Sequence, residues 1–287
     1  MLDRYNNISD STPFFICDFS SPKTNVGLTF KEATRIPCDV FVNYSPGTSV
    51  RLDSGIFAAS LKKQTNKNVI CAISPRDMNQ IALQSYLLGL NYLGLNTFVV
   101  LKGEKLTSKD QDNFKIKPVS SMTTSDLIKS INDFNKGVDF RGKNIEITNQ
   151  FYIGATIDPY NEIKKEIKLI KKKIDGGAKF FITQPVYEIE TIDPFLYEFE
   201  NLIKQLKVDV PLFIGIQIID IKGRNWGKMD DRFKEQLSKH KDPVFIAKKL
   251  VKEFLNKGFN KFYVIPPIRI GGIRDYGMAT ELIKSFL

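Results

Sequence analysis

The chain has 287 residues, a formal net charge of +10 and a hydrophobic fraction of 42%. This length fits one large domain or two small ones, and the hydrophobic fraction is ordinary for a globular core. The three cysteines, Cys17, Cys38 and Cys71, are widely spaced and have neither a CxxC pattern nor a histidine nearby. We therefore expect no disulfide framework and no cysteine metal site, and we predict a protein of the reducing cytoplasm.

The chain contains a single histidine, His240, in a charged segment that is typical of a solvated loop or helix end. The sequence therefore disfavours Ser-His-Asp triads, HExxH zinc sites and histidine-rich iron sites, which need imidazoles that the chain does not provide. We expect no secretory leader and no membrane span, since the most apolar stretch, Leu87–Leu101, is short and interrupted by asparagines. If the chain is an enzyme, carboxylates or a bound cofactor must perform the reaction.

Short β-rich segments alternate with helical patterns along the whole chain. The eight expected strands are Phe14–Phe19, Asp39–Tyr44, Val69–Ser74, Thr97–Lys102, Phe151–Ile157, Lys179–Val186, Pro211–Ile219 and Lys261–Ile268. Most are continuously apolar, as strands covered on both faces should be. The helical patterns between them include Asp77–Gly94, Thr123–Gly137 and Asn161–Gly176. This alternation predicts a single (β/α)8 TIM barrel over residues 1–287, with an open doubly wound sheet as the alternative.

Two long connections follow the fourth and seventh expected strands, at Gly103–Met122 and Asp220–Pro243. Polar loops at the carboxyl ends of barrel strands commonly close over ligands, and a surface insertion without function is the other interpretation. No GxGxxG motif follows the first strand, which disfavours the doubly wound sheet.

A basic amphipathic helix leads through a Gly-Gly turn into a buried strand that ends on Thr183 and Gln184. In α/β barrels the carboxyl ends of the strands bear the active site, so Gln184 is a candidate site residue. Its other interpretation is an amide that pairs with a neighbouring loop. The lysines are spread over many helices, which favours a solvated outer face over nucleic-acid binding. Their field would still attract an anionic ligand.

Four blocks of the sequence are similar to one known family, in register. They are Ile16–Lys23, Ser74–Glu104, Gly154–Pro159 and Lys171–Tyr187. Together they resemble methylenetetrahydrofolate reductases, most closely the reductase domain that is fused to homocysteine methyltransferases in some bacteria. The resemblance extends over nearly the whole chain.

The resemblance implies an oxidoreductase that binds FAD at the carboxyl face of a barrel. NADH or NADPH would reduce the flavin, and 5,10-methylenetetrahydrofolate or a related methylene-tetrahydropterin would be reduced to its 5-methyl form. Such an enzyme serves one-carbon metabolism and methionine biosynthesis. A metal is not expected, and the resemblance leaves open a homo-oligomer or an electron-transfer partner.

The resemblance assigns catalytic or substrate roles to three residues. Asp18 stands where the family has a general-acid glutamate, which protonates N10 so that the methylene bridge opens to a 5-iminium cation. Glu104 replaces a family aspartate near the flavin that stabilises this cation, and Gln184 matches the glutamine that hydrogen-bonds the pterin. The other interpretation of Asp18 is a strand-end cap. Asp18 replaces a glutamate and Glu104 replaces an aspartate, so each carboxylate is displaced by about one methylene, and such a displacement can slow a reaction strongly. The alternative function is therefore a catalytically weakened flavin- or pterin-binding subunit that acts in a complex.

Six further residues correspond to cofactor-binding positions of the family: Asn43, Ser74, Lys102, Ile157, Glu166 and Lys173. Glu166 and Lys173 lie seven residues apart on one expected helix and therefore share a face. The resemblance places Glu166 at the ribose hydroxyls and Lys173 at the cofactor, whereas each alone would be interpreted as an ordinary surface charge.

Overall fold

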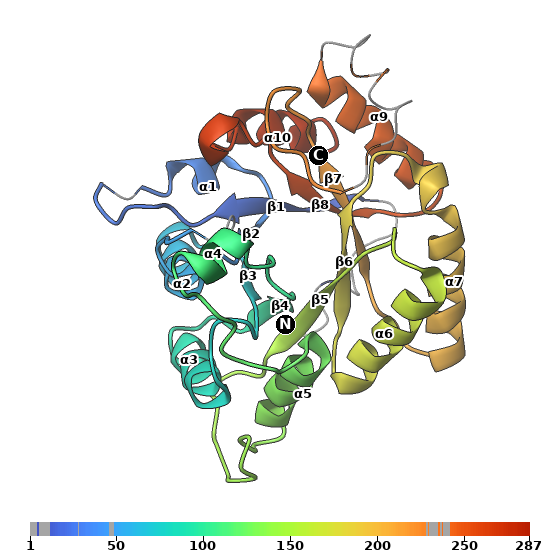
Figure 1. The fold of residues 1–287 in the computed structure, drawn as a ribbon. Helices are drawn as coiled ribbons and strands as arrows, with labels where there is room; N and C mark the ends of the chain where they lie inside the picture. The colour runs from blue at the N-terminus through green and yellow to red at the C-terminus, as the bar shows by residue number, and fades with distance from the viewer. Residues whose placement is uncertain are drawn as a thin grey trace.

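Eight parallel strands form a closed barrel in which every strand pairs with its neighbours in chain order and β8 pairs with β1 (Figure 1). The computed structural model describes residues 5, 12–27, 29–45, 49–227, 229, 235, 237 and 242–287, so His240 lies outside the described residues. The strands are β1 (Phe14–Ser20), β2 (Asp39–Asn43), β3 (Val69–Ile73), β4 (Thr97–Val100), β5 (Tyr152–Ile157), β6 (Phe180–Pro185), β7 (Leu212–Gln217) and β8 (Lys261–Ile265). The closed order confirms the predicted (β/α)8 barrel and excludes the open sheet.

Helices surround the barrel and follow its strands along the chain (Figure 1). They are α1 (Lys31–Arg35), α2 (Ser54–Thr65), α3 (Gln80–Tyr92), α4 (Ser108–Asp112), α5 (Thr124–Asn135), α6 (Ile163–Gly176), α7 (Asp193–Leu206), α9 (Pro243–Asn256) and α10 (Tyr276–Lys284), with 3-10 turns η2 (Ile189–Thr191) and η3 (Ile270–Gly272). Local sequence sets their ends, since the side chains of Asp53, Asn79, Thr123 and Asp242 cap the first turns of four of them. Across these described ranges, no helix combines the length and hydropathy that a bilayer crossing requires.

Side chains along each strand alternate between two apolar layers. In β1, Phe15 and Cys17 pack between the strands and the helices, whereas Ile16 packs inside the barrel. The same period of two turns Asp18 toward the interior. At the amino end aromatic rings fill the barrel interior. The Tyr5 ring centroid, for example, lies 5.3 Å from that of Phe180. Because the amino end is filled in this way, the space left for polar side chains such as Asp18 lies toward the carboxyl end.

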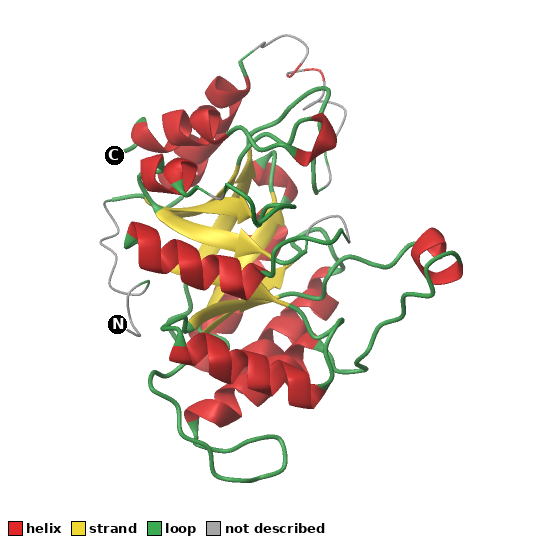
Figure 2. Cartoon of the chain, turned by 90° about the vertical axis from the view of Figure 1, so that its left-hand side faces the viewer, coloured by secondary structure: helices red, strands yellow, loops and turns green. Residues whose placement is uncertain are grey.

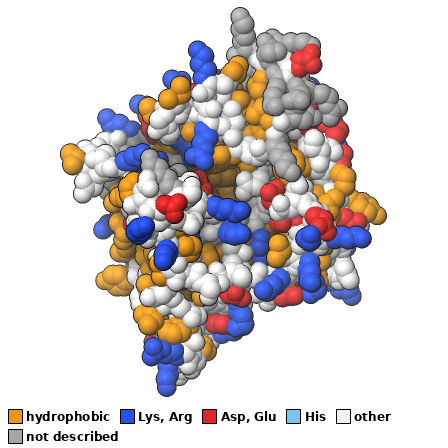
Figure 3. All heavy atoms as spheres, in the orientation of Figure 1, with side chains coloured by type: hydrophobic (Ala, Val, Ile, Leu, Met, Phe, Trp, Pro, Cys, Tyr) orange, Lys and Arg blue, Asp and Glu red, His pale blue; other side chains and the backbone are white. Residues whose placement is uncertain are grey.

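The connections at the carboxyl end are tied closely to one another. The amide of Arg224, in the β7–α9 connection, donates to the carbonyl of Ile268 in the β8–α10 connection at 2.8 Å. A Cβ at Gly223 would lie 2.1 Å from that same carbonyl oxygen, so only glycine permits this approach. By contrast, α4 stands away from the barrel on its long connection (Figure 2). On the face seen in Figure 3, a central hollow is bordered by Lys and Arg side chains.

Candidate active site at the carboxyl end of the barrel

A cavity of about 760 Å³ opens at the carboxyl ends of the strands, within the usual range for small-molecule sites. Four of the predicted site residues line it: Asn43, Lys102, Glu104 and Gln184. They come from the ends of β2, β4 and β6, which are separated in the sequence and brought together by barrel closure. Their convergence is the arrangement that (β/α)8 enzymes use to assemble an active site.

Gln184 is the polar residue best placed to recognise a ligand. It lies near the end of β6, and its side chain is half-buried in the cavity wall. Within the described part of the chain, its side-chain amide makes no hydrogen bond, so the interpretation as a loop-pairing amide receives no support. A half-buried amide without a protein partner offers both a donor and an acceptor to a bound heterocycle.

Asp18 lies beneath the cavity and has no exposed surface. Its Oδ1 accepts from the Tyr263 hydroxyl at 2.6 Å and from the Asn43 amide at 3.3 Å. Its Oδ2 forms an ion pair with Arg274 Nη2 at 2.8 Å, although the donor direction falls short of hydrogen-bond geometry. Asp18 therefore ties β1 to β2, β8 and the β8–α10 connection. It reaches the cavity wall through Asn43 and Tyr263, which both line the cavity.

Tyr263 and Arg274 complete this cluster, and the sequence analysis did not identify either of them. Burial, reinforced by the neighbouring Asp18 carboxylate, raises the pKa of Tyr263 well above its ordinary value. The phenol is therefore a neutral hydrogen-bond donor at neutral pH. Alternation along β8 would have placed Tyr263 in the barrel interior, but no local pattern marks Arg274, which lies in a loop.

Glu104, Lys102 and Ser74 lie at the β3 and β4 side of the cavity. The Glu104 carboxylate is 3.8 Å from Arg224 Nη2 across the opening, and its side chain is 38% exposed, so it remains accessible. Lys102 is exposed at the rim. Ser74 is buried behind them, where its hydroxyl donates to the Lys102 carbonyl at 3.0 Å. Ser74 thus supports the rim from behind, and Glu104 and Lys102 present charge to a ligand.

The remaining three predicted cofactor contacts do not line the cavity. Ile157 is buried in the layer between the strands and the helices. Glu166 and Lys173 are also buried rather than surface charges, and Lys173 Nζ donates to the Thr156 carbonyl at 2.8 Å. Glu166 accepts from the Asp158 amide at 3.2 Å. Both charges therefore fix the end of β5 from its outer side.

Burial lowers the pKa of Lys173, and the negative charge of Glu166 opposes this shift only in part. Lys172, its neighbour on α6, is exposed. The seven-residue spacing thus places Glu166 and Lys173 on one face, as expected, but that face is turned to the barrel wall.

A flavin nucleotide fits the cavity in part. The volume suits an aromatic ring system, and Lys102 and Lys105 supply positive charge at the rim for a pyrophosphate. The ribose contacts expected of Glu166 and Lys173 have no counterpart in the cavity lining. In the described ranges, no cluster of three or more histidine, cysteine or acidic side chains has the geometry of a metal site.

Comparison with known proteins identifies a family and solved structures of similar fold. Residues 4–253 match the family model described as methylenetetrahydrofolate reductase. No curated protein matches the sequence. Among solved structures, the chain is similar to one described as "Uncharacterized protein from Clostridium thermocellum binds two copies of 5-methyl-5,6,7,8-tetrahydrofolic acid". The two share 17% identity and a TM-score of 0.64 over 96% of this chain and 95% of that one, a likeness that shows the fold alone.

Proposed function

The chain belongs to the methylenetetrahydrofolate reductase family, and from this premise we propose that it reduces a 5,10-methylene-tetrahydropterin to the 5-methyl form. The hydride donor is NADH or NADPH, and the bound cofactor is FAD. The reaction consumes one hydride and one proton for each methylene bridge that is opened. We assign the activity to one-carbon metabolism, close to that of the reductase domains fused to homocysteine methyltransferases.

The observation that supports this proposal best is the unpaired amide of Gln184 in the wall of the 760 Å³ cavity. A pterin ring presents adjacent donors and acceptors along one edge, and a side-chain amide pairs with such an edge through two hydrogen bonds. The solved structure from Clostridium thermocellum, which has the same fold, is described as binding a methyltetrahydrofolate. A reduced pterin is therefore the ligand that the cavity suits best.

The residues around this amide have distinct roles in the proposed reaction. The chemistry that a bound FAD would supply is hydride transfer from the nicotinamide to the methylene carbon of the substrate. Asn43, Lys102 and Gln184 are the cavity residues that would hold the ring systems and the pyrophosphate. The accessible carboxylate of Glu104 stabilises the positive charge that develops as the methylene bridge opens.

In the proposed reaction the proton that opens the bridge comes from the protonated form of Asp18 and passes through Tyr263. In the structure Asp18 is paired with Arg274, so it must first take up a proton. Because Asp18 is fully buried, its carboxyl group does not meet a ligand directly. The Tyr263 hydroxyl is 2.6 Å from Asp18 Oδ1 and lies in the cavity wall. The Tyr263 hydroxyl donates to Asp18 Oδ1 in the structure. Once Asp18 is protonated, the hydroxyl oxygen can accept that proton while the hydroxyl gives its own to N10 of the substrate.

A reconstitution experiment tests the proposal. The purified protein is incubated with excess FAD, separated from free flavin and assayed for oxidation of NADH and of NADPH with methylenetetrahydrofolate as acceptor. We expect stoichiometric noncovalent FAD and formation of methyltetrahydrofolate. Absence of flavin retention would contradict the proposal.

A second candidate function is a flavin- or pterin-binding subunit with weakened catalysis, which acts in a complex. It is favoured by the burial of Asp18 and by its ion pair with Arg274, which together withdraw the expected acid from the cavity. Flavin retention and pterin binding without steady-state turnover would identify this second function.

A further inference from the structure

Gln217 is a buried polar residue behind the wall of the candidate active site. It is the last residue of β7, where the period of two turns its side chain toward the barrel interior, as for Phe213. The residue is 4% exposed and is not among the described residues that line the 760 Å³ cavity. A buried amide is costly unless its polar atoms have partners, so the partners of Gln217 indicate what it does.

The side-chain amide of Gln217 binds the backbone of the β7–α9 connection. Gln217 Oε1 accepts from the Trp226 amide at 2.7 Å, and Gln217 Nε2 donates to the Arg224 carbonyl at 3.0 Å. One partner is a backbone donor and the other a backbone acceptor, so together they fix which way the side-chain amide is turned. Gln217 therefore holds residues 224–227, which we call the wall segment because all four line the cavity.

Tyr187 supports the wall segment from the end of β6. Its hydroxyl is placed to donate either to Gln217 Oε1, at 2.9 Å, or to the Trp226 carbonyl. Burial raises the pKa of Tyr187, so the hydroxyl keeps its proton for these acceptors. Gly227 has a φ of 79°, and a Cβ there would lie 2.7 Å from the Pro185 carbonyl oxygen. The wall segment thus lies close against the ends of β6 and β7.

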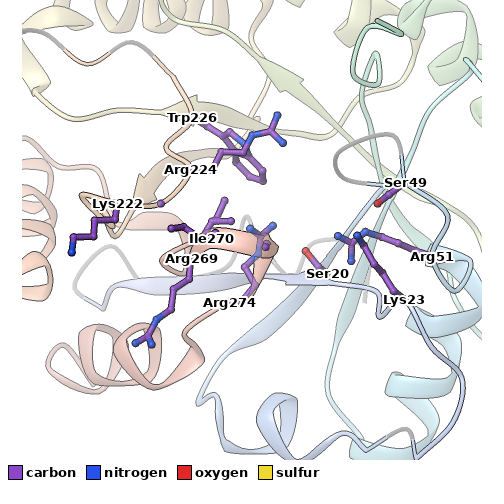
Figure 4. Close-up of a pocket in the computed structure, with 14 residues that line it drawn as sticks. Ser20, Lys23, Ser49, Arg51, Lys222, Arg224, Trp226, Arg269, Ile270 and Arg274 are labelled. Carbon is purple, nitrogen blue, oxygen red and sulfur yellow. The ribbon is translucent and has the colours of Figure 1, made fainter. Parts of the chain in front are cut away.

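The wall segment contacts the surroundings of both carboxylates of the proposed reaction. Arg224 Nη2 lies 3.8 Å from the Glu104 carboxylate. The Trp226 ring centroid lies 5.1 Å from the Arg274 guanidinium, which pairs with Asp18. Figure 4 shows Arg224 and Trp226 on the same part of the connection, with Arg274 below them in the view. A shift of the wall segment would therefore move the cation beside Glu104 and the ring that covers the cation beside Asp18.

We propose that Gln217 is a positioning residue of the proposed reaction, which fixes the wall segment and thereby the surroundings of Asp18 and Glu104. The inference rests on the proposed function, because it takes both carboxylates to act in the reduction of the pterin. Gln217 stands behind the cavity lining, so it acts through Arg224 and Trp226. Because a displacement of about 1 Å can slow a reaction by about a hundredfold, partial freedom of the wall segment should have a measurable effect.

The fluorescence of Trp226 tests whether Gln217 fixes the wall segment, because Trp226 is the only tryptophan of the chain. Gln217→Met keeps the length of the side chain but removes the partner of the Trp226 amide and of the Arg224 carbonyl. We expect the emission to shift to longer wavelength and its quenching by acrylamide to increase. Tyr187→Phe, which removes one hydroxyl, should produce the same change to a smaller extent. Unchanged emission and quenching in both variants would overturn the proposal.

Gln84→Met is the matched control. Gln84 is 5% exposed, and its amide likewise holds a loop, since Oε1 accepts from the Phe140 amide at 3.0 Å and Nε2 donates to Ser130 Oγ at 2.9 Å. These three residues are not among the described residues that line the cavity. The control variant therefore loses buried hydrogen bonds of the same kind without affecting the wall segment. It should keep the Trp226 emission and both half-reactions of the wild type.

Stopped-flow measurements on the FAD-loaded protein test the consequence for the reaction. Gln217→Met should slow reoxidation of the reduced flavin by methylenetetrahydrofolate by about tenfold and leave flavin reduction by the nicotinamide within about twofold of the wild type. The two carboxylates act only in the folate step, so a positioning role predicts this difference. Circular dichroism establishes that the variant is folded, and Tyr187→Phe serves for the same comparison if Gln217→Met does not fold.

The outcomes separate this inference from the proposed function. Equal slowing of both half-reactions, or equal slowing by Gln217→Met and Gln84→Met, would overturn the positioning role, since either would reflect a general loss of structure. Unchanged reoxidation in Gln217→Met, beside an active wild type, would overturn it as well and leave the proposed function intact. Failure of the folate to reoxidise the wild-type flavin would contradict the proposed function, whereas the Trp226 fluorescence would still decide whether Gln217 fixes the wall segment.

Discussion

The buried ion pair between Asp18 and Arg274 predicts a large loss of stability on substitution of Arg274. Arg274→Ala removes a guanidinium that is 4% exposed and leaves the carboxylate of Asp18, which is fully buried, without its counter-charge. Breaking a buried pair in this way costs about 3–5 kcal/mol, because the remaining charge stays desolvated. The Tyr263 and Asn43 donors reduce this cost, so we expect about 3 kcal/mol.

Urea unfolding of Arg274→Ala, followed by circular dichroism, measures this loss as a lower midpoint with an unchanged slope. Arg269→Ala is the matched control, because Arg269 lies in the same connection and pairs with Asp275 at the surface. That variant should lose less than about 1 kcal/mol. The double variant Asp18→Asn with Arg274→Ala should lose less than the sum of the two single variants, since neither charge is then left alone. Equal losses in Arg274→Ala and Arg269→Ala would refute the buried pair as a source of stability.

Three further predictions concern individual residues of the site. Gln184→Ala should raise the KM for methylenetetrahydrofolate by about tenfold and leave NAD(P)H oxidation with an artificial acceptor unchanged, and parallel loss of both activities in steady-state assays would instead indicate a structural role. Tyr263→Phe should slow flavin reoxidation by the folate and spare flavin reduction in stopped-flow measurements, and an unchanged reoxidation rate would show that Tyr263 does not carry the proton. Lys173→Met should remove the contribution of Lys173 to the pH dependence of the unfolding free energy. Burial lowers the pKa of Lys173 in the folded state, so between this lowered pKa and the ordinary lysine pKa the unfolded chain binds more protons than the folded one. The unfolding free energy of the wild type, relative to Lys173→Met, should therefore rise with pH across this window in urea titrations, and a constant difference would contradict the assignment.

The sequence predicts the barrel because its strands are buried on both faces. Each strand is therefore a continuous apolar run that is easily recognised in the sequence. Each expected strand overlaps the observed one, as for Phe14–Phe19 against β1 and Lys179–Val186 against β6. Strand ends are less well predicted, since residues such as Ile218 and Ile219 continue the apolar run beyond β7 and are buried by the connection. An apolar residue indicates burial, but the residue at which a strand ends is set by its hydrogen bonds to the neighbouring strand, which the composition does not show.

The positions of some candidate site residues also follow from the strand pattern. Gln184 follows from its place at the end of a strand, where the barrel geometry decides the direction of the side chain, whereas Asn43 is expected from the family resemblance; both line the cavity. Glu166 and Lys173 share a face as their spacing requires, but the spacing does not tell whether that face meets the cavity or the barrel wall. The pairing of Asp18 with Arg274 joins residues 256 positions apart and follows only from closure of β8 against β1.

The central claim, that this chain reduces a methylene-tetrahydropterin through a bound flavin, is tested most directly by an anaerobic stopped-flow experiment. The FAD-loaded protein is mixed first with NADH or NADPH and then with methylenetetrahydrofolate, and flavin absorbance is followed in each step. We predict that the absorbance bleaches with the nicotinamide and returns with the folate. Asp18→Asn should keep the first step and slow the second by about a hundredfold, within the range of general-acid catalysis. Failure of methylenetetrahydrofolate to restore the absorbance of the reduced wild-type protein would contradict the account.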